Sequence, residues 1–216
     1  KELIKVIKEV SPHTKVVVGG NLGASAELLL RLCDVDVCAI GEGERIMVNL
    51  ANHWSENANK TDLGQLGAIK GLCFLNDQED MVFTGYEVAI AATEFLHPDW
   101  SILEEYSNID NFIFDPFHRY DFAQDIRSYE FDRKGKKWAT VVTAKGCVAR
   151  CTFCHRWDRG YRHWGVASIA EKIKYLKDKY NVGFISFGDE NFGSDRRKLE
   201  ELILEMKSLD VLWQVG

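Results

Sequence analysis

The chain has 216 residues, of which 46% are hydrophobic, and its formal net charge at pH 7 is -6. This length and apolar content are enough to bury the core of one or two domains, and they favour a soluble globular protein. No apolar run approaches the roughly 18 to 20 residues that span a bilayer, and no basic start leads into an apolar signal segment. We therefore expect a cytoplasmic protein without a membrane span.

Residues 1–54 alternate between helical and strand-like patterns. Leu3, Ile4 and Ile7 share one helical face and predict a first helix over residues 1–10. The elements predicted after it are a strand at 15–20, a helix at 25–32, a strand at 35–41 and a helix at 42–54. Such alternation predicts an α/β fold, a parallel sheet with helices on its faces.

Residues 55–137 break this rhythm. Two strand-like runs within residues 68–85 flank the turn residues Asn76, Asp77 and Gln78 and predict a β-hairpin. The aromatic, Pro-punctuated stretch over residues 95–122 has no sustained period. We expect a linker that packs against another part of the protein.

The alternation resumes at residue 138. A strand is predicted at 138–144, a helix at 168–180, a strand at 182–192 and a further helix from about Asp195. Ser168 and Glu171 have the spacing of a capping box at the start of the first of these helices. The chain begins within a helical pattern and ends on a strand-like run, so we expect it to be an excerpt of a longer protein.

Three of the six cysteines form a cluster. Cys33, Cys38 and Cys73 lie among apolar neighbours, where a free cysteine usually behaves as a small buried hydrophobe in a reducing compartment. The cluster has the spacing C-x3-C-x2-C, in a loop that follows a predicted strand. Its members are Cys147, Cys151 and Cys154.

Soft thiolates suit zinc, copper(I) or an iron-sulfur cluster. A zinc site would need His155 or His163 as its fourth ligand, and residues 151–155 also match CxxCH, the pattern of covalent haem attachment, which leaves Cys147 unused. In a 4Fe-4S cluster, three cysteines leave one iron open for another ligand. The basic side chains around the loop would stabilise thiolates or an anionic cluster. They are Lys145, Arg150, Arg156, Arg159 and Arg162.

The string Cys147-x3-Cys151-x-Phe153-Cys154 resembles the signature of radical S-adenosylmethionine enzymes, in which an aromatic residue precedes the third cysteine. The resemblance implies a 4Fe-4S cluster whose open iron is chelated by S-adenosylmethionine. It also implies reductive cleavage to a 5'-deoxyadenosyl radical, with an electron donor such as flavodoxin or ferredoxin.

A second loop follows the next predicted barrel strand. In a parallel β/α barrel, loops after the strands open on one rim, so this loop and the cysteine loop should lie together. The loop resembles the family's second element, which contacts the amino group of S-adenosylmethionine. Its residues are Gly188, Asp189, Glu190 and Asn191. The alternative is an acidic turn that leads into a helix N-terminus.

The first half, in this order ahead of the cysteine loop, resembles the cobalamin-binding class of these enzymes. Gly19 and Gly20 follow one predicted strand, while Gly41 and Glu42 follow the next. Glycine permits close backbone approach, and the carboxyl ends of parallel strands are where such sheets bind ligands. The alternative is two tight turns without a ligand, and the family's DxHxxG element, whose histidine can ligate cobalt, does not occur here.

These patterns divide the chain into three expected parts. They are the end of a cobalamin-binding Rossmann-like domain at 1–54, a linker with a β-hairpin at 55–137 and the start of a radical S-adenosylmethionine barrel at 138–216. The resemblance implies an anaerobic enzyme acting on a small molecule, by methyl transfer or by a cyclisation or rearrangement. The alternatives are a radical methylthiotransferase acting on RNA, against which the charge of -6 argues, and a zinc-binding interaction module.

Overall fold

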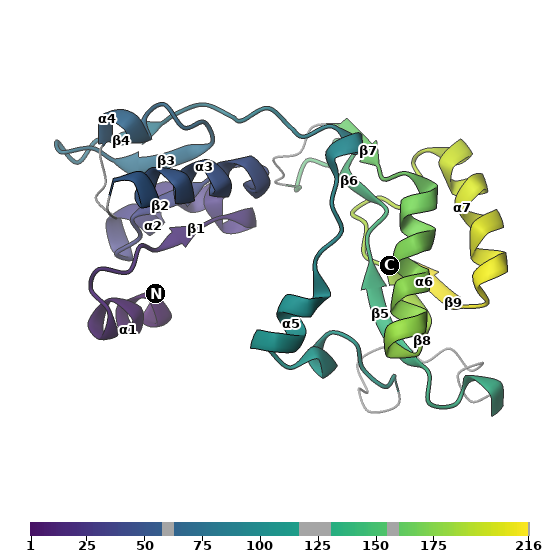
Figure 1. Ribbon diagram of the computed structural model, residues 1–216. Coiled ribbons are helices and arrows are strands. Elements are labelled where there is room, and N and C mark those ends of the chain that lie inside the picture. The colour runs from purple at the N-terminus through teal and green to yellow at the C-terminus, as the bar shows by residue number, and fades with distance from the viewer. Residues whose placement is uncertain (58–62, 117–130, 155–159, 216) are drawn as a thin grey trace. The chain divides into compact units, whose positions relative to one another are not determined.

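The computed structural model describes residues 1–57, 63–116, 131–154 and 160–215 (Figure 1). The chain divides into two compact units. The first comprises residues 1–90 and takes in residues 150–154, and the second comprises residues 91–149 and 160–215. None of the helices in these ranges is long and apolar enough to pass through a bilayer.

The first unit is built on a four-stranded sheet of order β1-β2-β3-β4. The pair β1 and β2 is parallel, whereas β3 lies antiparallel to both β2 and β4. The strands are β1 (Val17–Val18), β2 (Val37–Ala39), β3 (Leu72–Leu75) and β4 (Met81–Phe83). The predicted hairpin is therefore present as β3 and β4, and it extends the α/β sheet rather than standing apart from it.

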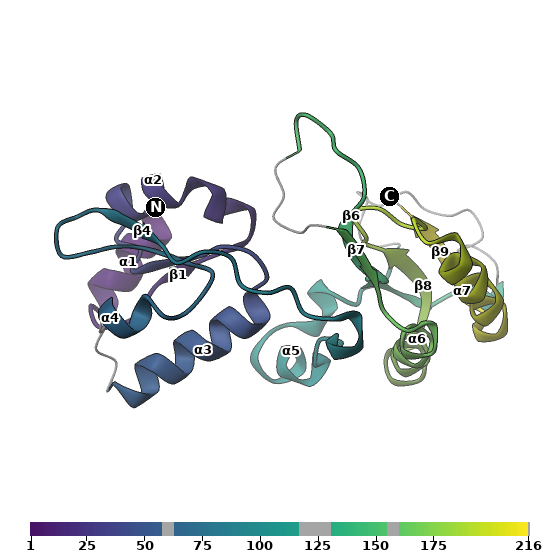
Figure 2. The same ribbon diagram turned by 90° about the horizontal axis from the view of Figure 1, so that it is seen from above.

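Helices cover both faces of this sheet, as the alternation predicted (Figure 2). They are α1 (Glu2–Val10), the 3-10 helix η1 (Gly20–Ser25), α2 (Ala26–Leu32), α3 (Gly43–Glu56) and α4 (Leu63–Leu66). Successive residues of β2 point to opposite faces. Cys38 packs in the same core as Leu30 of α2, while Val37 packs in the other core with Ile46 and Leu50 of α3.

The entry to β3 depends on a glycine. Gly71 has φ +81°, and a Cβ added to it would lie 2.2 Å from Ile46 Cδ1 and 2.7 Å from Ile46 Cγ1. Its amide donates to the Gly85 carbonyl at 2.7 Å, and its own carbonyl accepts from Ile40 N at 2.7 Å. No other residue fits both this backbone conformation and this close approach.

The second unit holds a parallel sheet of order β5-β8-β9. Its main elements are β5 (Lys137–Val141), α6 (Val166–Tyr180), β8 (Val182–Phe187), α7 (Arg196–Leu209) and β9 (Leu212–Val215). The predicted β-α-β-α-β order is confirmed in this unit. The helix α7 begins as expected after Asp195, whose side chain accepts from Lys198 N at 3.1 Å.

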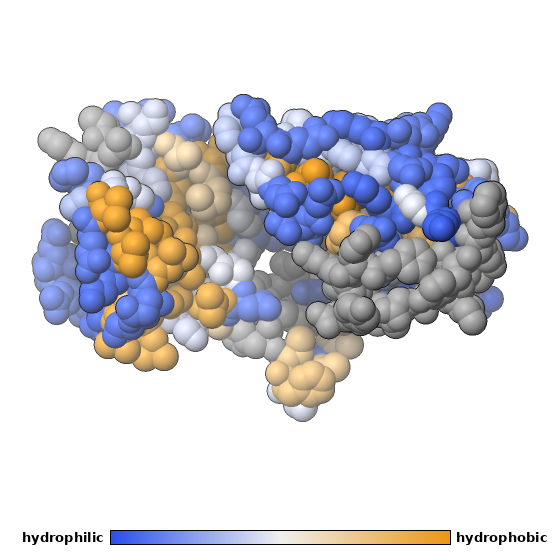
Figure 3. Space-filling model, turned by 90° about the horizontal axis from the view of Figure 1, so that it is seen from below, coloured by the Kyte–Doolittle hydropathy of each residue, from blue (hydrophilic) through white to orange (hydrophobic). Residues whose placement is uncertain are grey.

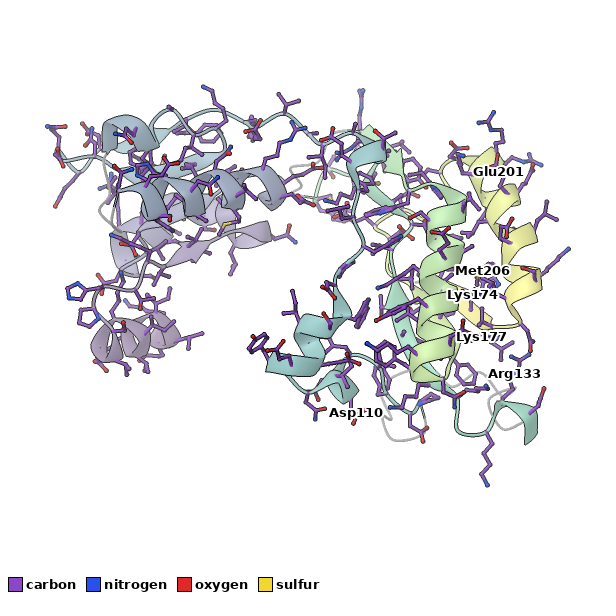
Figure 4. All side chains as sticks on the ribbon, in the orientation of Figure 1. Asp110, Arg133, Lys174, Lys177, Glu201 and Met206 are labelled. Carbon is purple, nitrogen blue, oxygen red and sulfur yellow. The ribbon has the colours of Figure 1, made fainter. Side chains whose placement is uncertain are left out.

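Polar contacts tie the turn after α7 to the rest of this unit (Figure 4). Lys177 of α6 donates to the Leu209 carbonyl. Arg133, in the short 3-10 helix η5 (Phe131–Arg133), donates to the Asp210 carboxylate at 2.8 Å. The pair α6 and α7 is thereby joined at the end where β9 begins.

The capping-box prediction for α6 was wrong. This helix starts at Val166 after Gly165, so Ser168 lies inside its first turn. The Ser168 hydroxyl instead lies 2.9 Å from His97 Nε2, which also lies 3.1 Å from the Ser168 carbonyl. The Ser–Glu spacing is present, but Ser168 lies three residues after the actual N-cap, Gly165, and therefore cannot cap the helix.

The segment before β5 packs on α6, as a linker that lies against another element should. It holds η2 (Ala92–Glu94), α5 (Trp100–Tyr106) and η3 (Ile109–Asn111). The Phe95 and Trp164 rings lie 4.2 Å apart, and Lys172 of α6 donates to the Pro98 carbonyl at 3.2 Å. Burial lowers the pKa of Lys172 to about 8.

Candidate functional site

The cysteine loop is framed by a ribbon that the sequence pattern did not reveal. Strands β6 (Ala144–Cys147) and β7 (Gly160–His163) pair antiparallel, with Cys147 opposite Gly160. Cys147 therefore ends a hydrogen-bonded strand. Each strand is only four residues long, too short for its alternation to stand out from the surrounding loop.

Cys147 is the cysteine of the motif whose surroundings are best defined. Its side chain is half-buried, and its Sγ accepts from two N–H donors. The side-chain amide of Asn191 lies 3.3 Å from this sulfur, and the backbone amide of Ala149 lies 3.4 Å from it. Such donors favour the thiolate, the form that binds metals.

The other two cysteines of the motif are exposed free thiols. The Cys154 amide donates to the Cys151 carbonyl at 3.2 Å, which closes a turn around Phe153. Phe153 is 89% exposed, so its ring contributes little to packing. His155, Arg156 and Arg159 lie outside the described residues.

Among the residues that the structure describes, no three His, Cys, Asp or Glu side chains gather closely enough to hold a metal ion. The chemistry of the donors fits an iron-sulfur cluster, because Cys147, Cys151 and Cys154 are all free thiols. Their assembly around a cluster remains a prediction.

The loop after β8 reaches the start of the cysteine loop through Asp189. One carboxylate oxygen, Oδ1, accepts from the amides of Thr143 at 2.7 Å and Ala144 at 2.6 Å. The other, Oδ2, accepts from the Thr143 hydroxyl at 3.0 Å. The loop after β8 is thus joined by three hydrogen bonds to the turn between β5 and β6, three residues before the first cysteine of the motif.

The neighbours of Asp189 have different surroundings. Gly188 continues the β5–β8 pairing by donating to the Val141 carbonyl at 3.0 Å, and a Cβ added to it would lie 2.9 Å from Thr140 Cγ2. Glu190 is exposed. The role of these residues in binding S-adenosylmethionine remains a prediction, and Asp189 has a structural role that the sequence did not indicate.

Two of the basic side chains near the loop pack on an aromatic ring. The Lys145 ammonium lies 5.2 Å from the centre of the Phe95 ring, and the Arg162 guanidinium lies 5.5 Å from it. These are cation–π distances. Two of the basic side chains around the loop therefore hold Phe95 against the ribbon of β6 and β7.

In the first unit, the two predicted glycine turns follow neighbouring parallel strands. Gly19 and Gly20 come directly after β1, while Gly41 and Glu42 follow β2. Because the strands are parallel, both turns lie at the same edge of the sheet. Gly20 has φ +65° and Gly41 has φ +106°, and a Cβ on either would have no atom within 4 Å.

Glu42 has a defined partner within this unit, since its Oε2 accepts from the Ile90 amide at 3.1 Å. This contact ties the turn after β2 to the end of the segment that follows the hairpin. Its role in binding a cofactor remains a prediction, as do those of the glycines beside it.

The remaining cysteines fit the structural role expected for them in two cases of three. Cys38 and Cys73 are buried opposite each other on β2 and β3. Burial, with a smaller contribution from Cys73, raises the pKa of Cys38 to about 11, which makes it a poor nucleophile. Cys33 is half-buried and packs against the same core.

No family model matches the chain. It is 29% identical over 210 residues to the anaerobic magnesium-protoporphyrin IX monomethyl ester cyclase of Cereibacter sphaeroides, covering 95% of this chain and 30% of that protein. The chain spans about a third of the length of the curated relatives that it matches first.

Solved structures of cobalamin-dependent radical enzymes share the fold. The methyltransferase TsrM from Kitasatospora setae, solved with cobalamin and a 4Fe-4S cluster, aligns with a TM-score of 0.59 at 19% identity, over 95% of this chain and 36% of its own. The enzyme OxsB, solved with aqua-cobalamin and S-adenosylmethionine, aligns with a TM-score of 0.64 at 16% identity, over 99% of this chain and 27% of its own.

The α/β architecture, with its parallel sheet and hairpin, thus matches part of a cobalamin-binding radical S-adenosylmethionine enzyme. The chain is similar in sequence to the cyclase and in fold to these radical enzymes over nearly its whole length, and it corresponds to a fraction of theirs.

Proposed function

We propose that this chain is the part of a radical S-adenosylmethionine enzyme that carries the 4Fe-4S cluster and one wall of a cobalamin site. The observation that carries the proposal is the C-x3-C-x2-C loop, held at its start by Asp189 of the loop after the neighbouring parallel strand. The similarity to such enzymes over nearly the whole chain supports it.

In this proposal Cys147, Cys151 and Cys154 would hold the cluster, which would leave one iron available to S-adenosylmethionine. When bound, the cluster supplies the electron that cleaves S-adenosylmethionine. Phe153, exposed between two of the ligands, covers the cluster from solvent. The exposed carboxylate of Glu190 suits a cationic amino group. The carboxylate oxygens of Asp189 already accept from Thr143 and Ala144, and we call these hydrogen bonds the Asp189 clamp.

The glycine turns after β1 and β2 form the proposed wall for cobalamin. Both lie at the carboxyl edge of a parallel pair, where α/β sheets bind ligands. A Cβ at Gly20 or Gly41 would face open space, so the absence of a side chain lets the cofactor's nucleotide tail approach the backbone closely. What ligates cobalt is not part of this proposal.

The reaction that we propose is methyl transfer or a related cyclisation on a small-molecule substrate, with a flavodoxin or ferredoxin as electron donor. The relatives include a cyclase and a methyltransferase. These similarities support the choice of chemistry.

The test is anaerobic reconstitution of the full-length protein with iron and sulfide. We expect about four irons and four sulfides per chain, and we expect Cys147→Ala, Cys151→Ala and Cys154→Ala each to lose them. Cys33→Ala, which removes a half-buried thiol outside the motif, should retain the cluster. One zinc per chain without sulfide, or an intact cluster in all three variants, would refute the proposal.

A further inference from the structure

Asn191 and Cys147 are 44 positions apart in the sequence and in hydrogen-bond contact in the structure. The Asn191 side-chain amide donates to Cys147 Sγ at 3.3 Å. Sulfur is a large, weak acceptor, so this distance is that of a formed hydrogen bond. The resemblance implied contact with S-adenosylmethionine for Asn191, whereas the structure directs its donor at a proposed cluster ligand.

Asn191 is held in place from both sides along the chain. Two residues before it, Asp189 makes its three hydrogen bonds to Thr143 and Ala144. On the other side, the Phe192 ring stacks on Phe187 of β8, with ring centres 4.9 Å apart. The donor is thus presented from a backbone segment that is anchored on both sides.

The acceptor is also fixed. Cys147 ends β6 and is paired across the ribbon with Gly160. A backbone donor, the Ala149 amide, approaches the same sulfur at 3.4 Å. Because strand pairing and the Asp189 clamp set both partners, the geometry is a preorganised N–H···S contact rather than a chance approach of two loop side chains.

Hydrogen bonds to cysteine sulfurs are one of the means by which proteins set the reduction potential of iron-sulfur clusters. Uptake of one electron, from a donor that is itself oxidised by one electron, makes the cluster and its cysteine sulfurs more negative. A donor aimed at one of those sulfurs stabilises the reduced state more than the oxidised state.

We propose that Asn191 is a positioning residue that donates a hydrogen bond to the Cys147 thiolate and thereby raises the reduction potential of the cluster. The inference rests on the proposed function, because it requires the cluster. It gives the loop after β8 two tasks toward the cysteine loop: Asp189 holds the start of the loop, and Asn191 tunes its first ligand.

The test is a potentiometric titration of the reconstituted full-length protein, with reduced cluster followed by EPR spectroscopy. Asn191→Leu removes the donor at similar volume, Asn191→Asp removes it at nearly identical shape but adds a negative charge, and Asn191→Gln keeps an amide donor. The matched control is Asn52→Leu, the same exchange at an exposed position of α3. Iron and sulfide content is measured for every variant.

We expect Asn191→Leu and Asn191→Asp to shift the potential downward. At a fixed ambient potential, the ratio of reduced to oxidised cluster should fall by roughly threefold to tenfold, and a tenfold fall equals about 59 mV for a one-electron couple. The reduction potential of Asn191→Gln should lie closer to that of the wild type than the potential of Asn191→Leu does, and Asn52→Leu should have the wild-type potential.

The failure of the inference is distinct from the failure of the proposed function. A wild-type protein that assembles no cluster refutes both. A cluster with the wild-type potential in Asn191→Leu and Asn191→Asp overturns the inference alone, and weaker binding of S-adenosylmethionine in those variants would then assign Asn191 to that ligand. If Asn191→Leu does not retain a cluster, Asn191→Ala, which also removes the donor without adding a charge, takes its place in the comparison with Asn191→Gln.

Discussion

The Asp189 clamp can be tested without any cofactor. Asp189→Ala removes the acceptor for the Thr143 amide, the Ala144 amide and the Thr143 hydroxyl. A hydrogen bond to a charged group contributes about 1.5–3 kcal/mol when isolated, but three bonds to one half-exposed carboxylate are not additive. We expect the free energy of unfolding to fall by about 2–4 kcal/mol.

A series of substitutions that remove these hydrogen bonds in steps gives a more specific test. Asp189→Asn keeps Oδ1 for the two amides and should cost less than Asp189→Ala, while Thr143→Val removes only the hydroxyl bond and should cost about 1 kcal/mol. The exposed neighbour serves as control, since Glu190→Ala should change stability by less than about 0.5 kcal/mol. The assays are urea unfolding and hydrogen exchange at the Thr143 and Ala144 amides. Equal stability of Asp189→Ala and Glu190→Ala, with unchanged protection of both amides, would show that the clamp contributes nothing.

Two further predictions concern packing inside each unit, at Gly71 in the first and at His97 in the second. Gly71→Ala should destabilise the protein by about 2–5 kcal/mol in thermal or urea unfolding, because it combines a left-handed backbone with a Cβ 2.2 Å from Ile46 Cδ1. Gly85→Ala, at φ +84° with its nearest atom at 4.0 Å, should show only the backbone part, and equal losses would contradict the argument. Burial, and then Lys172, lower the pKa of His97 below its ordinary 6.5, so the unfolded chain gains a proton first as pH falls. The stability from neutral His97 is therefore complete above pH 6.5 and declines below it. His97→Gln should show a smaller loss between pH 7 and pH 5 in urea unfolding, and a slope equal to that of the wild type would exclude His97 as its source.

The hydrophobic pattern alone predicted much of the fold. Within residues 1–54 and 138–215 the expected helices and strands occur in the expected order, because the helices are long enough to show their period and short apolar runs mark the buried strands. The short strands β6 and β7 showed no such pattern. The hairpin at 68–85 was found from its turn residues, but its pairing with β2 depends on contacts across the sheet that no local pattern encodes.

The exposed hydrophobic side chains of the first unit illustrate a further limit of pattern reading. Leu3 and Val10 of α1 are 71% and 81% exposed, while Ile4 and Ile7 of the same helix pack against the core. Figure 3 shows hydrophobic surface on this unit. The pattern predicted the helix and its single apolar face correctly, but it gave no indication that only the Ile4 and Ile7 side of that face would be covered by the core.

The spacing of residues in the sequence identifies some residues of the candidate site, whereas the contacts between them are seen only in the folded structure. The C-x3-C-x2-C spacing identified three thiols because the soft-ligand chemistry resides in the residues themselves. The partner of Cys147, Asn191, comes from 44 positions away, and Asp189 reaches Thr143 across 46 positions; β5 and β8 bring these segments together as parallel neighbours. A carboxylate and an amide in a loop such as GDEN suggest a ligand, because polar side chains after a barrel strand usually face the substrate. Here Asp189 and Asn191 face the protein instead. A residue that positions or tunes a ligand can thus have the same sequence pattern as a residue that binds one, and the acceptor atom distinguishes them.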